Sequence, residues 1–273
     1  MNLYVDDFDR ISDVKQHPEL KEIFKYPHAN WICGHKGNLT SSIQRYCKRA
    51  ADKLPTFVLY NIPNRDLNHH SKGGARDYDS YLKFVEDFSI GLGDNKTIII
   101  VEPDAIPHAC HTRDNLLLAF RLTIIKAALS ILSRNVNARI YIDVGHPRWI
   151  PFDQIITTLN AINLPYTGFS LNVSNYIPTD ECLVYGQLIS QMTGKTFVID
   201  TSRNGNKPLS DEWCNPAWAI CGTKPTLDTK IRNCDGFLWI KIPGESDGRC
   251  NGGPKAGRFS PLHAQYLLSG INS

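Results

Sequence analysis

The sequence lacks a long apolar run, a signal peptide, an excess of one charge and a closely spaced cysteine pair. No apolar run approaches the ~20 residues of a membrane-spanning helix, so we expect no membrane segment. The start, MNLYVDDFDR, lacks the basic and apolar regions of a signal peptide, which fits an intracellular protein or a mature or excised domain with an added Met. With 30 Lys and Arg against 27 Asp and Glu and no basic stripe, we expect no nucleic-acid partner.

Two common kinds of catalytic site are also absent from the sequence. There is no G-x-S-x-G elbow for a nucleophilic serine. His108, Cys110 and His111 lie together, and His69 and His70 could join them, but the set has no recognised zinc spacing. We therefore expect neither a metal nor a cofactor.

The eight cysteines are the one feature that points to an oxidising compartment. Cys214 and Cys250 both lie in polar loops that flank the last expected strand, where a disulfide would pin the loops. Together with the function inferred below, this favours a secreted protein, which we expect to be a monomer.

Short apolar runs alternate with helical patterns, which is typical of a parallel β/α architecture. A chain of 273 residues that is 42% hydrophobic can bury one large core, and α/β barrels often reach this length as one domain. We predict a single domain over residues 1–273, with a segment around Trp31 as a candidate seventh strand. The expected strands are Thr56–Tyr60, Thr97–Val101, Arg139–Ile142, Gly168–Asn172, Thr196–Ile199 and Gly236–Ile240. The expected helices are Asp77–Leu92, Asn115–Ser133, Asp153–Ile162, Thr179–Met192 and one that begins at Ser260-Pro261.

Aspartates follow the ends of five apolar runs: Asp66, Asp104, Asp143, Asp200 and Asp247. In a parallel barrel or open sheet these carboxylates would converge at one mouth. Tryptophans are interleaved with them, at Trp31, Trp149 and Trp213. Carboxyl groups can protonate a leaving oxygen and help water to attack, and aromatic faces stack on sugar rings. The pattern indicates a site that breaks glycosidic bonds.

The segment Ile98–Asp104 is an apolar strand that ends in Glu-Pro-Asp. Partial burial would raise the pKa of Asp104, which a general acid working near neutral pH needs. The alternative is an aspartate that only caps the next helix. Arg65 beside Asp66 can keep that carboxylate ionised, but this segment could equally be a solvated turn.

Other segments place polar or aromatic side chains after strands. Asp143, His146 and Trp149 suggest a substrate platform, although a lone Trp is more often a core residue. Hydrogen-bonding runs that contain Asn172 and Arg203 suit sugar hydroxyls or ordinary loops. The stretch 201–235 has no clear periodicity, and a loop of that length is more often functional than idle.

The last of these segments contains three charges at alternate positions, Lys241, Glu245 and Asp247. In an extended segment, side chains spaced by two share a face, so we expect these charges to line one side of a cleft.

Taken in order, these segments resemble glycoside hydrolase family 6, the inverting cellulases. The resemblance runs from about Trp31 to Leu268 through YNIPNRD, VEPDA, YIDVGH, NVSNY, DTSRNG, WCNP, FLWIKIPGESDG and AGRF. It implies a distorted parallel β/α barrel of about seven strands, with an active-site cleft at the carboxyl ends of the strands. It also implies inverting hydrolysis of β-1,4-glucans such as cellulose and cello-oligosaccharides.

The resemblance assigns roles to individual residues. Asp104 matches the general acid, Asp66 the residue that tunes it and organises water, and Asp247 the proposed base; a water-relayed route through Asp66 stays open. Tyr60 would press on the distorted sugar, and Ser71 lies on the loop that holds the water. The matches at the −2 subsite are Trp31, Trp213, Lys241 and Glu245, and those on the +1 side are Asp143, His146 and Trp149. A further substrate contact matches Asn172, and the residues that set the charge of the acid match Arg65 and Arg203. The resemblance also implies a Cys214–Cys250 bridge.

The loop RDLNHHSKGGA is closer to the endoglucanase version than to that of cellobiohydrolases, and Phe152 stands where processive members have a second Trp. An open cleft and internal cutting follow. Leu67 replaces the family's cysteine after Arg-Asp, so the N-terminal disulfide expected there cannot form, and Lys72 adds a charge near the acid. Two alternatives stay open: an exo-acting cellobiohydrolase, and a glucan-binding or cellulose-synthesis-associated domain with weak or no hydrolysis.

Overall fold

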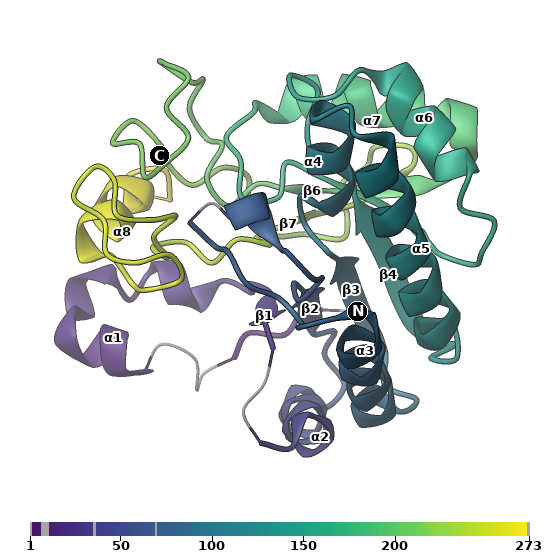
Figure 1. The fold of residues 1–273 in the computed structure, drawn as a ribbon. Helices are drawn as coiled ribbons and strands as arrows, with labels where there is room; N and C mark the ends of the chain where they lie inside the picture. The colour runs from purple at the N-terminus through teal and green to yellow at the C-terminus, as the bar shows by residue number, and fades with distance from the viewer. Residues whose placement is uncertain (1, 7–10, 35–36, 69, 272–273) are drawn as a thin grey trace.

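The computed structural model describes residues 2–6, 11–34, 37–68 and 70–271. Its centre is a curled sheet of parallel strands that neighbour each other in strict chain order (Figure 1). The strands are β1 (Asn30–Ile32), β2 (Thr56–Leu59), β3 (Thr97–Val101), β4 (Ala138–Asp143), β5 (Gly168–Leu171), β6 (Thr196–Asp200) and β7 (Cys234–Leu238). This confirms the predicted distorted β/α barrel, including the seventh strand around Trp31.

The two edges of the sheet almost meet. His28, before β1, bridges Trp239, after β7, and the Ala29 backbone N–H donates to the Trp239 carbonyl at 3.0 Å. The Trp31 indole donates to the Ile240 carbonyl at 2.8 Å. These contacts curl the sheet so that the carboxyl ends of the first and last strands lie on the same mouth.

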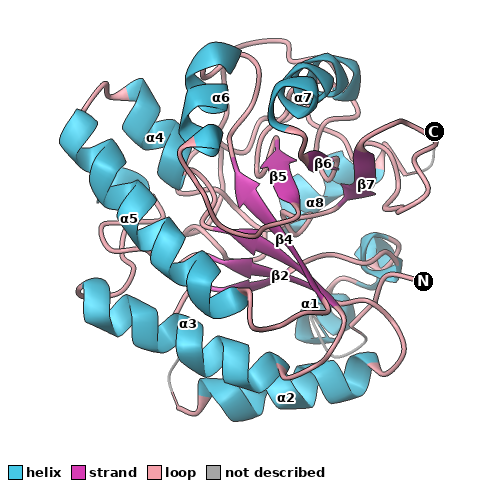
Figure 2. Ribbon diagram, turned by 90° about the vertical axis from the view of Figure 1, so that its right-hand side faces the viewer, coloured by secondary structure: helices cyan, strands magenta, loops and turns pink. Residues whose placement is uncertain are grey.

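Helices follow one another around the outer face of the sheet (Figure 2). The longer ones are α2 (Leu39–Ala50), α3 (Tyr78–Leu92), α5 (Asn115–Leu132), α6 (Phe152–Asn160) and α7 (Thr179–Thr193). The shorter ones are α1 (Ile11–Gln16), α4 (Ala105–His111) and α8 (Pro261–Leu268), with 3-10 turns η1 (Pro18–Leu20), η2 (Ile23–Lys25) and η3 (Asp66–Asn68). Asp77 caps α3 by accepting from the Ser80 N–H at 2.8 Å. The five predicted helices are confirmed, whereas α1, α2 and α4 were not predicted.

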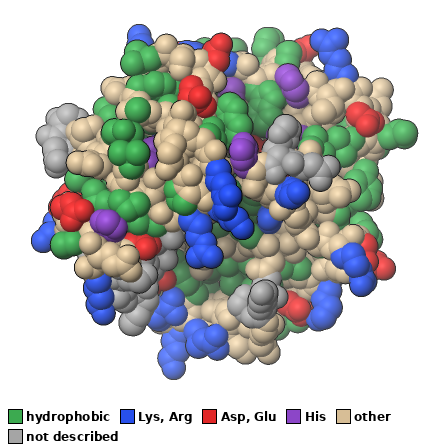
Figure 3. Space-filling model, turned by 60° about the vertical axis from the view of Figure 1, so that its left-hand side comes forward, with side chains coloured by type: hydrophobic (Ala, Val, Ile, Leu, Met, Phe, Trp, Pro, Cys, Tyr) green, Lys and Arg blue, Asp and Glu red, His purple; other side chains and the backbone are tan. Residues whose placement is uncertain are grey.

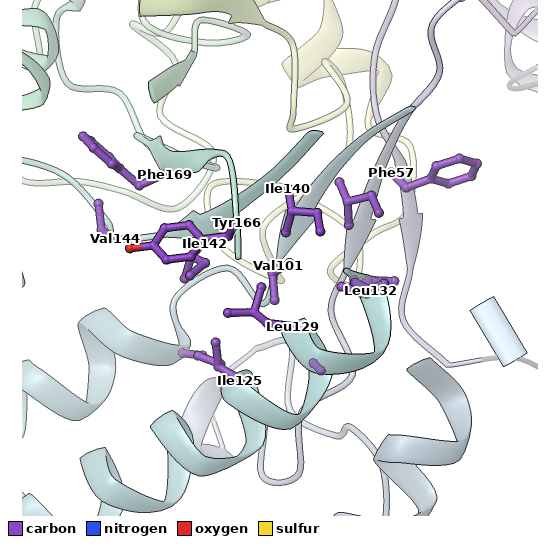
Figure 4. Close-up of a cluster of buried hydrophobic side chains, with 14 of the residues drawn as sticks. Phe57, Val101, Ile125, Leu129, Leu132, Ile140, Ile142, Val144, Tyr166 and Phe169 are labelled. Atoms are coloured by element: carbon purple, nitrogen blue, oxygen red, sulfur yellow. The ribbon is translucent and has the colours of Figure 1, made fainter. Parts of the chain in front are cut away.

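Strands β2, β3 and β5 are buried on both faces, which explains the continuous apolar runs in the sequence. Inside the curl, Val58, Ile100 and Tyr141 pack with Val198 and Leu238. On the outer face, alternate strand residues pack under the helices. Figure 4 shows this second layer, in which Ile125, Leu129 and Leu132 of α5 face Val101, Ile140 and Ile142.

Helix α5 is long and apolar enough, by length and composition alone, to cross a membrane, which corrects the expectation that no segment comes near this threshold. In the fold it serves as a core helix, because the face that contains Leu129 packs on the sheet. Leu116 and Phe120 lie on its exposed side.

Charged side chains of both signs lie on the surface. On the face in Figure 3, Lys and Arg side chains gather near the centre beside histidine and apolar side chains. Ion pairs also form at the surface, such as Arg134 with Glu86 at 2.8 Å and Arg148 with Glu181 at 2.6 Å. Such pairs contribute at most about 1 kcal/mol each to stability.

Two leucines on α5 provide a matched test of this packing. Leu129 is 0% exposed and Leu116 is 83% exposed. Leu129→Ala should lower the free energy of unfolding by about 2–5 kcal/mol, because it leaves a cavity under the sheet. Leu116→Ala should change it by less than about 0.5 kcal/mol. Urea unfolding measures both, and equal losses would contradict the packing of α5 described above.

Candidate active site

Carboxylates from the end of β4 and from the segments after β2, β3 and β7 meet at the carboxyl ends of the strands. Burial raises the pKa of Asp104 well above its ordinary value, and the charges of Asp143, Asp66 and Asp247 raise it further, while Lys241 opposes them. Groups that influence one another in this way share one site. Four of the five predicted aspartates, Asp66, Asp104, Asp143 and Asp247, therefore come together in the fold.

Asp104 follows β3 and precedes α4 with a left-handed backbone, φ 68°. Its side chain makes no capping hydrogen bond to α4, so the structure does not support the capping alternative. Its backbone N–H donates to Asp143 Oδ2 at 2.9 Å. Asp143 is 1% exposed and also accepts from the Ser170 hydroxyl at 3.3 Å. Asp143 thus holds the backbone of Asp104, and its burial does not suit the direct substrate contact that we expected.

The loop after β2 is organised by Asp66 and Arg65. Asp66 Oδ2 accepts from the Ser71 N–H at 2.6 Å. The Arg65 guanidinium donates to the carbonyls of Ser71 at 2.8 Å, Cys33 at 3.3 Å and Tyr60, and it lies 4.6 Å from the centre of the Tyr60 ring. Arg65 was expected to set the charge of the acid. Its bonds to carbonyl oxygens make it a residue that shapes the loop instead.

Two glycines let this loop return to the barrel. The Arg65 N–H donates to the Gly73 carbonyl at 3.0 Å, and the backbone of Gly74 lies against Ile62. A Cβ at Gly74 would stand 2.0 Å from the Ile62 carbonyl oxygen, and its φ is +98°, so only glycine fits.

Asp247 lies in a different electrostatic environment from Asp104. Arg203 Nη1 donates to both of its oxygens at 2.9 and 2.8 Å, the Tyr176 hydroxyl donates at 2.9 Å, and Lys241 Nζ lies 3.5 Å away. Burial alone would raise the pKa of Asp247, but the charges of Arg203 and Lys241 outweigh it and hold the pKa below its ordinary value. Arg203 was expected to set the charge of the acid; it sets that of Asp247.

Lys241, Glu245 and Asp247 do not lie on an extended segment. Strand β7 ends at Leu238, and the Glu245 N–H turns back to the Ile242 carbonyl at 3.1 Å. Lys241 meets Asp247 because the chain turns. The expectation of a shared strand face is therefore wrong, although two of the three charges do come together. Glu245 is half-buried.

The loops that contain Trp213 and Asp247 are joined by the predicted Cys214–Cys250 disulfide, which the structure confirms. Asn215 strengthens the junction, since its side-chain oxygen accepts from the Asp247 N–H at 2.8 Å. The other cysteines, Cys33, Cys47, Cys110, Cys182, Cys221 and Cys234, are free thiols.

Aromatic rings lie at several places in the site. Trp31 and Tyr60 pack edge to face at 5.3 Å, and Tyr60 is largely buried. Trp149 is half-buried and lies 5.5 Å from the His146 ring, whose pKa burial lowers to about 4. Trp213 is 51% exposed. Such faces can stack on sugar rings.

Asn172 is not available to a ligand. It is 0% exposed, and its amide donates to the carbonyls of Ile177 at 3.2 Å and Asp200 at 2.9 Å while accepting from the Ile177 N–H at 3.0 Å. Asp200 is similarly buried and accepts four backbone N–H donors, including that of Lys241 at 2.9 Å. The predicted substrate contact at Asn172 is corrected to a role in holding two loops together.

Within the described ranges, which leave out His69, no group of three or more His, Cys, Asp or Glu side chains could hold a metal ion. His108 packs against Trp149 with ring centres 5.2 Å apart, and Cys110 is buried beside Thr158.

The chain is similar in sequence and in structure to known proteins. The sequence model of glycosyl hydrolases family 6 matches residues 4–270. The chain belongs to that family. Endoglucanase A of Cellulomonas fimi is 40% identical over 88% of the chain, and the chain spans 53% of that relative's length. A protein of Aspergillus niger named as a probable 1,4-β-D-glucan cellobiohydrolase is 26% identical over 70% of the chain and 51% of its own length.

A solved family 6 structure is also similar throughout. It is the endoglucanase Cel6 of Mycobacterium tuberculosis in complex with methyl-cellobiosyl-4-deoxy-4-thio-β-D-cellobioside. The TM-score is 0.93 at 35% identity, covering 100% of this chain and 98% of that one.

No role was predicted from the sequence for three buried residues of this family 6 chain: Glu102, Arg121 and Tyr176. Glu102 stands in the VEPDA segment and Tyr176 in NVSNY, so both lay within the matched segments. Arg121 interrupts the apolar pattern of α5 on its buried side. A charge on the buried face of a helix was the available signal.

The disulfide provides a stability test. Cys250→Ser should lower the free energy of unfolding by about 2–4 kcal/mol, because the bridge constrains the unfolded chain. The free and exposed Cys33 provides a control, since Cys33→Ser should leave stability nearly unchanged. Denaturant unfolding without reductant measures both variants. Non-reduced peptide mass spectrometry that finds Cys214 and Cys250 as free thiols would exclude the bridge.

Proposed function

We propose that this chain is the single catalytic domain, residues 1–273, of a secreted, monomeric endo-β-1,4-glucanase that cuts internal bonds of cellulose and related β-glucans with inversion. The observation that carries the proposal is Asp104, a carboxyl group with a strongly raised pKa among other carboxylates and aromatic faces. The greater identity to a named endoglucanase than to a named cellobiohydrolase supports internal cutting. The cello-oligosaccharide in the M. tuberculosis structure supports the substrate class. A disulfide suits an extracellular protein.

In the proposed mechanism Asp104 gives its proton to the glycosidic oxygen. Its raised pKa keeps the carboxyl protonated at pH values where an ordinary aspartate is ionised. Tyr60 presses on the sugar at the −1 subsite, with Trp31, Trp213, Lys241 and Glu245 on the −2 side and His146 and Trp149 on the +1 side. The positive charge of Lys241 also limits how far the neighbouring carboxylates can raise the pKa of Asp104.

Water is activated through the Asp66 side of the cleft in this proposal. Asp247 is a poor proton acceptor, because Arg203, Tyr176 and Lys241 stabilise its ionised form. Asp66 instead accepts from the backbone of Ser71, the residue whose loop would hold the attacking water. Asp247 then contributes a fixed negative charge opposite the positive charge that develops on the sugar.

Replacement of the acid tests this assignment. Asp104→Asn should lower kcat on unactivated cello-oligosaccharides by about 10²–10⁴-fold, because proton donation is lost. It should retain substrate binding. On the alkaline side of the pH profile, the wild-type rate should fall as the pH rises through the raised pKa of Asp104. The asparagine variant has no acidic proton at this position, so its profile should lack this fall. Asp52→Asn, at an exposed aspartate, should behave as wild type. A near-wild-type rate for Asp104→Asn would remove Asp104 from the mechanism.

Product analysis tests stereochemistry and mode of attack. An inverting site keeps its acid and base carboxyls about 6.5–9.5 Å apart to admit water, whereas a retaining pair lies at about 5–5.5 Å. The first product should be the α-anomer by proton NMR, and the viscosity of carboxymethylcellulose should fall sharply for each reducing end released. An initial β-anomer would refute inversion, and cellobiose with slow viscosity loss would indicate a cellobiohydrolase. Binding of cello-oligosaccharide without release of reducing ends would indicate a glucan-binding domain.

A further inference from the structure

We propose that Glu102 is a positioning residue for the hydrolysis, which with Arg121 fixes the segment Tyr60–Asp66 against the barrel and so sets the place of the attacking water. This inference rests on the proposed function and extends it to two residues that do not line the cleft. Both side chains are almost completely buried, Glu102 at 0% and Arg121 at 1% exposure.

Glu102 links the two strands that precede the acid and the loop of Asp66. Its carboxylate accepts from the Asn61 N–H at 3.1 and 3.0 Å and from the Ile62 N–H at 2.9 Å. Its own N–H donates to the Leu59 carbonyl at 2.8 Å. Asp104 follows two residues later in the chain. The first residues after β2 are therefore tied to the end of β3.

Arg121 binds the same segment from outside. It comes from α5 and donates through Nη2 to the Asn64 carbonyl at 2.7 Å. Asn64 and Asp66 both have a left-handed backbone, with φ of 53° and 58°. Such residues keep this conformation only where their surroundings enforce it. Glu102 at one end of residues 61–64 and Arg121 at the other supply that restraint.

A structural role alone gives little reason for charged groups at this position. Burying a charge costs free energy unless it is well paired, and Arg121 Nε and Nη1 have no hydrogen-bond partner among the described residues. Burial raises the pKa of Glu102 to about 7, while the N–H groups of Ile62 and Asn61, the Tyr81 hydroxyl and the Arg121 guanidinium oppose the rise. The two N–H donors favour the ionised carboxylate. The site therefore holds a costly charge to fix the backbone that leads to Asp66.

The variant Glu102→Gln tests this role, because it removes the negative charge that strengthens these bonds and replaces one of the two accepting oxygens with an amide donor. A misplacement of about 1 Å can cost about 10²-fold in rate, so kcat should fall by about 10–100-fold with the Kd for a thio-linked cello-oligosaccharide unchanged. The loss should be equal for cellotetraose and for an aryl cello-oligosaccharide with an activated leaving group. Asp104→Asn should differ, regaining rate on the activated substrate because proton donation is then less needed.

Two further variants complete the experiment. Glu86→Gln changes an exposed glutamate on α3 and should leave kcat unchanged. Arg121→Lys, which shortens the reach to Asn64, should reproduce the pattern of Glu102→Gln and decides the matter if Glu102→Gln does not fold. Folded variants with wild-type kcat on both substrates would overturn the inference, as would a loss confined to the unactivated substrate. A wild-type protein that hydrolyses neither substrate would overturn the proposed function as well.

Discussion

The burial of carboxylates at the carboxyl ends of the strands is the constraint on which the site depends. A buried carboxylate is unstable unless donors or positive charges surround it. Glu102 and Asp200 accept backbone N–H groups, and Asp247 is paired with Arg203. These bonds also join neighbouring loops, because each donor belongs to another part of the chain. The same interactions that make the carboxylates tolerable therefore hold the mouth of the barrel in shape.

Asp104 is the exception among these groups. Within the described part of the chain, no donor bonds to its carboxylate, and its surroundings hold three other carboxyl groups. Its protonated form is consequently favoured. Asp247, in the same site, is held ionised by Arg203 and Lys241. Identical side chains thus acquire opposite protonation states from their neighbours, which is how two aspartates can take different parts in one reaction.

The sequence predicted the strands and the convergence of the aspartates because both depend on local patterns. It could not tell which polar side chains after a strand face the cleft. Asn172 follows a strand as Asp104 does, and Asp143 ends one, yet both are turned to backbone groups of neighbouring segments. That choice depends on φ angles and on loops distant in sequence. Helix α2 was not predicted because its few buried residues, such as Ile43 and Tyr46, stand among many polar residues, which hides their helical spacing.

Arg65 shows that neighbouring positions in the sequence do not predict which side chains pair. Adjacent opposite charges in a sequence suggest an ion pair, but a left-handed backbone at Asp66 sends the two side chains to different partners. Arg65 then binds carbonyl oxygens and covers the Tyr60 ring, while Asp66 accepts from Ser71. Asp66 therefore has a carboxylate whose orientation is set by the loop. Asp247, which is paired with Arg203, is a weak proton acceptor, and this is why the proposed route for the proton of the attacking water runs through Asp66.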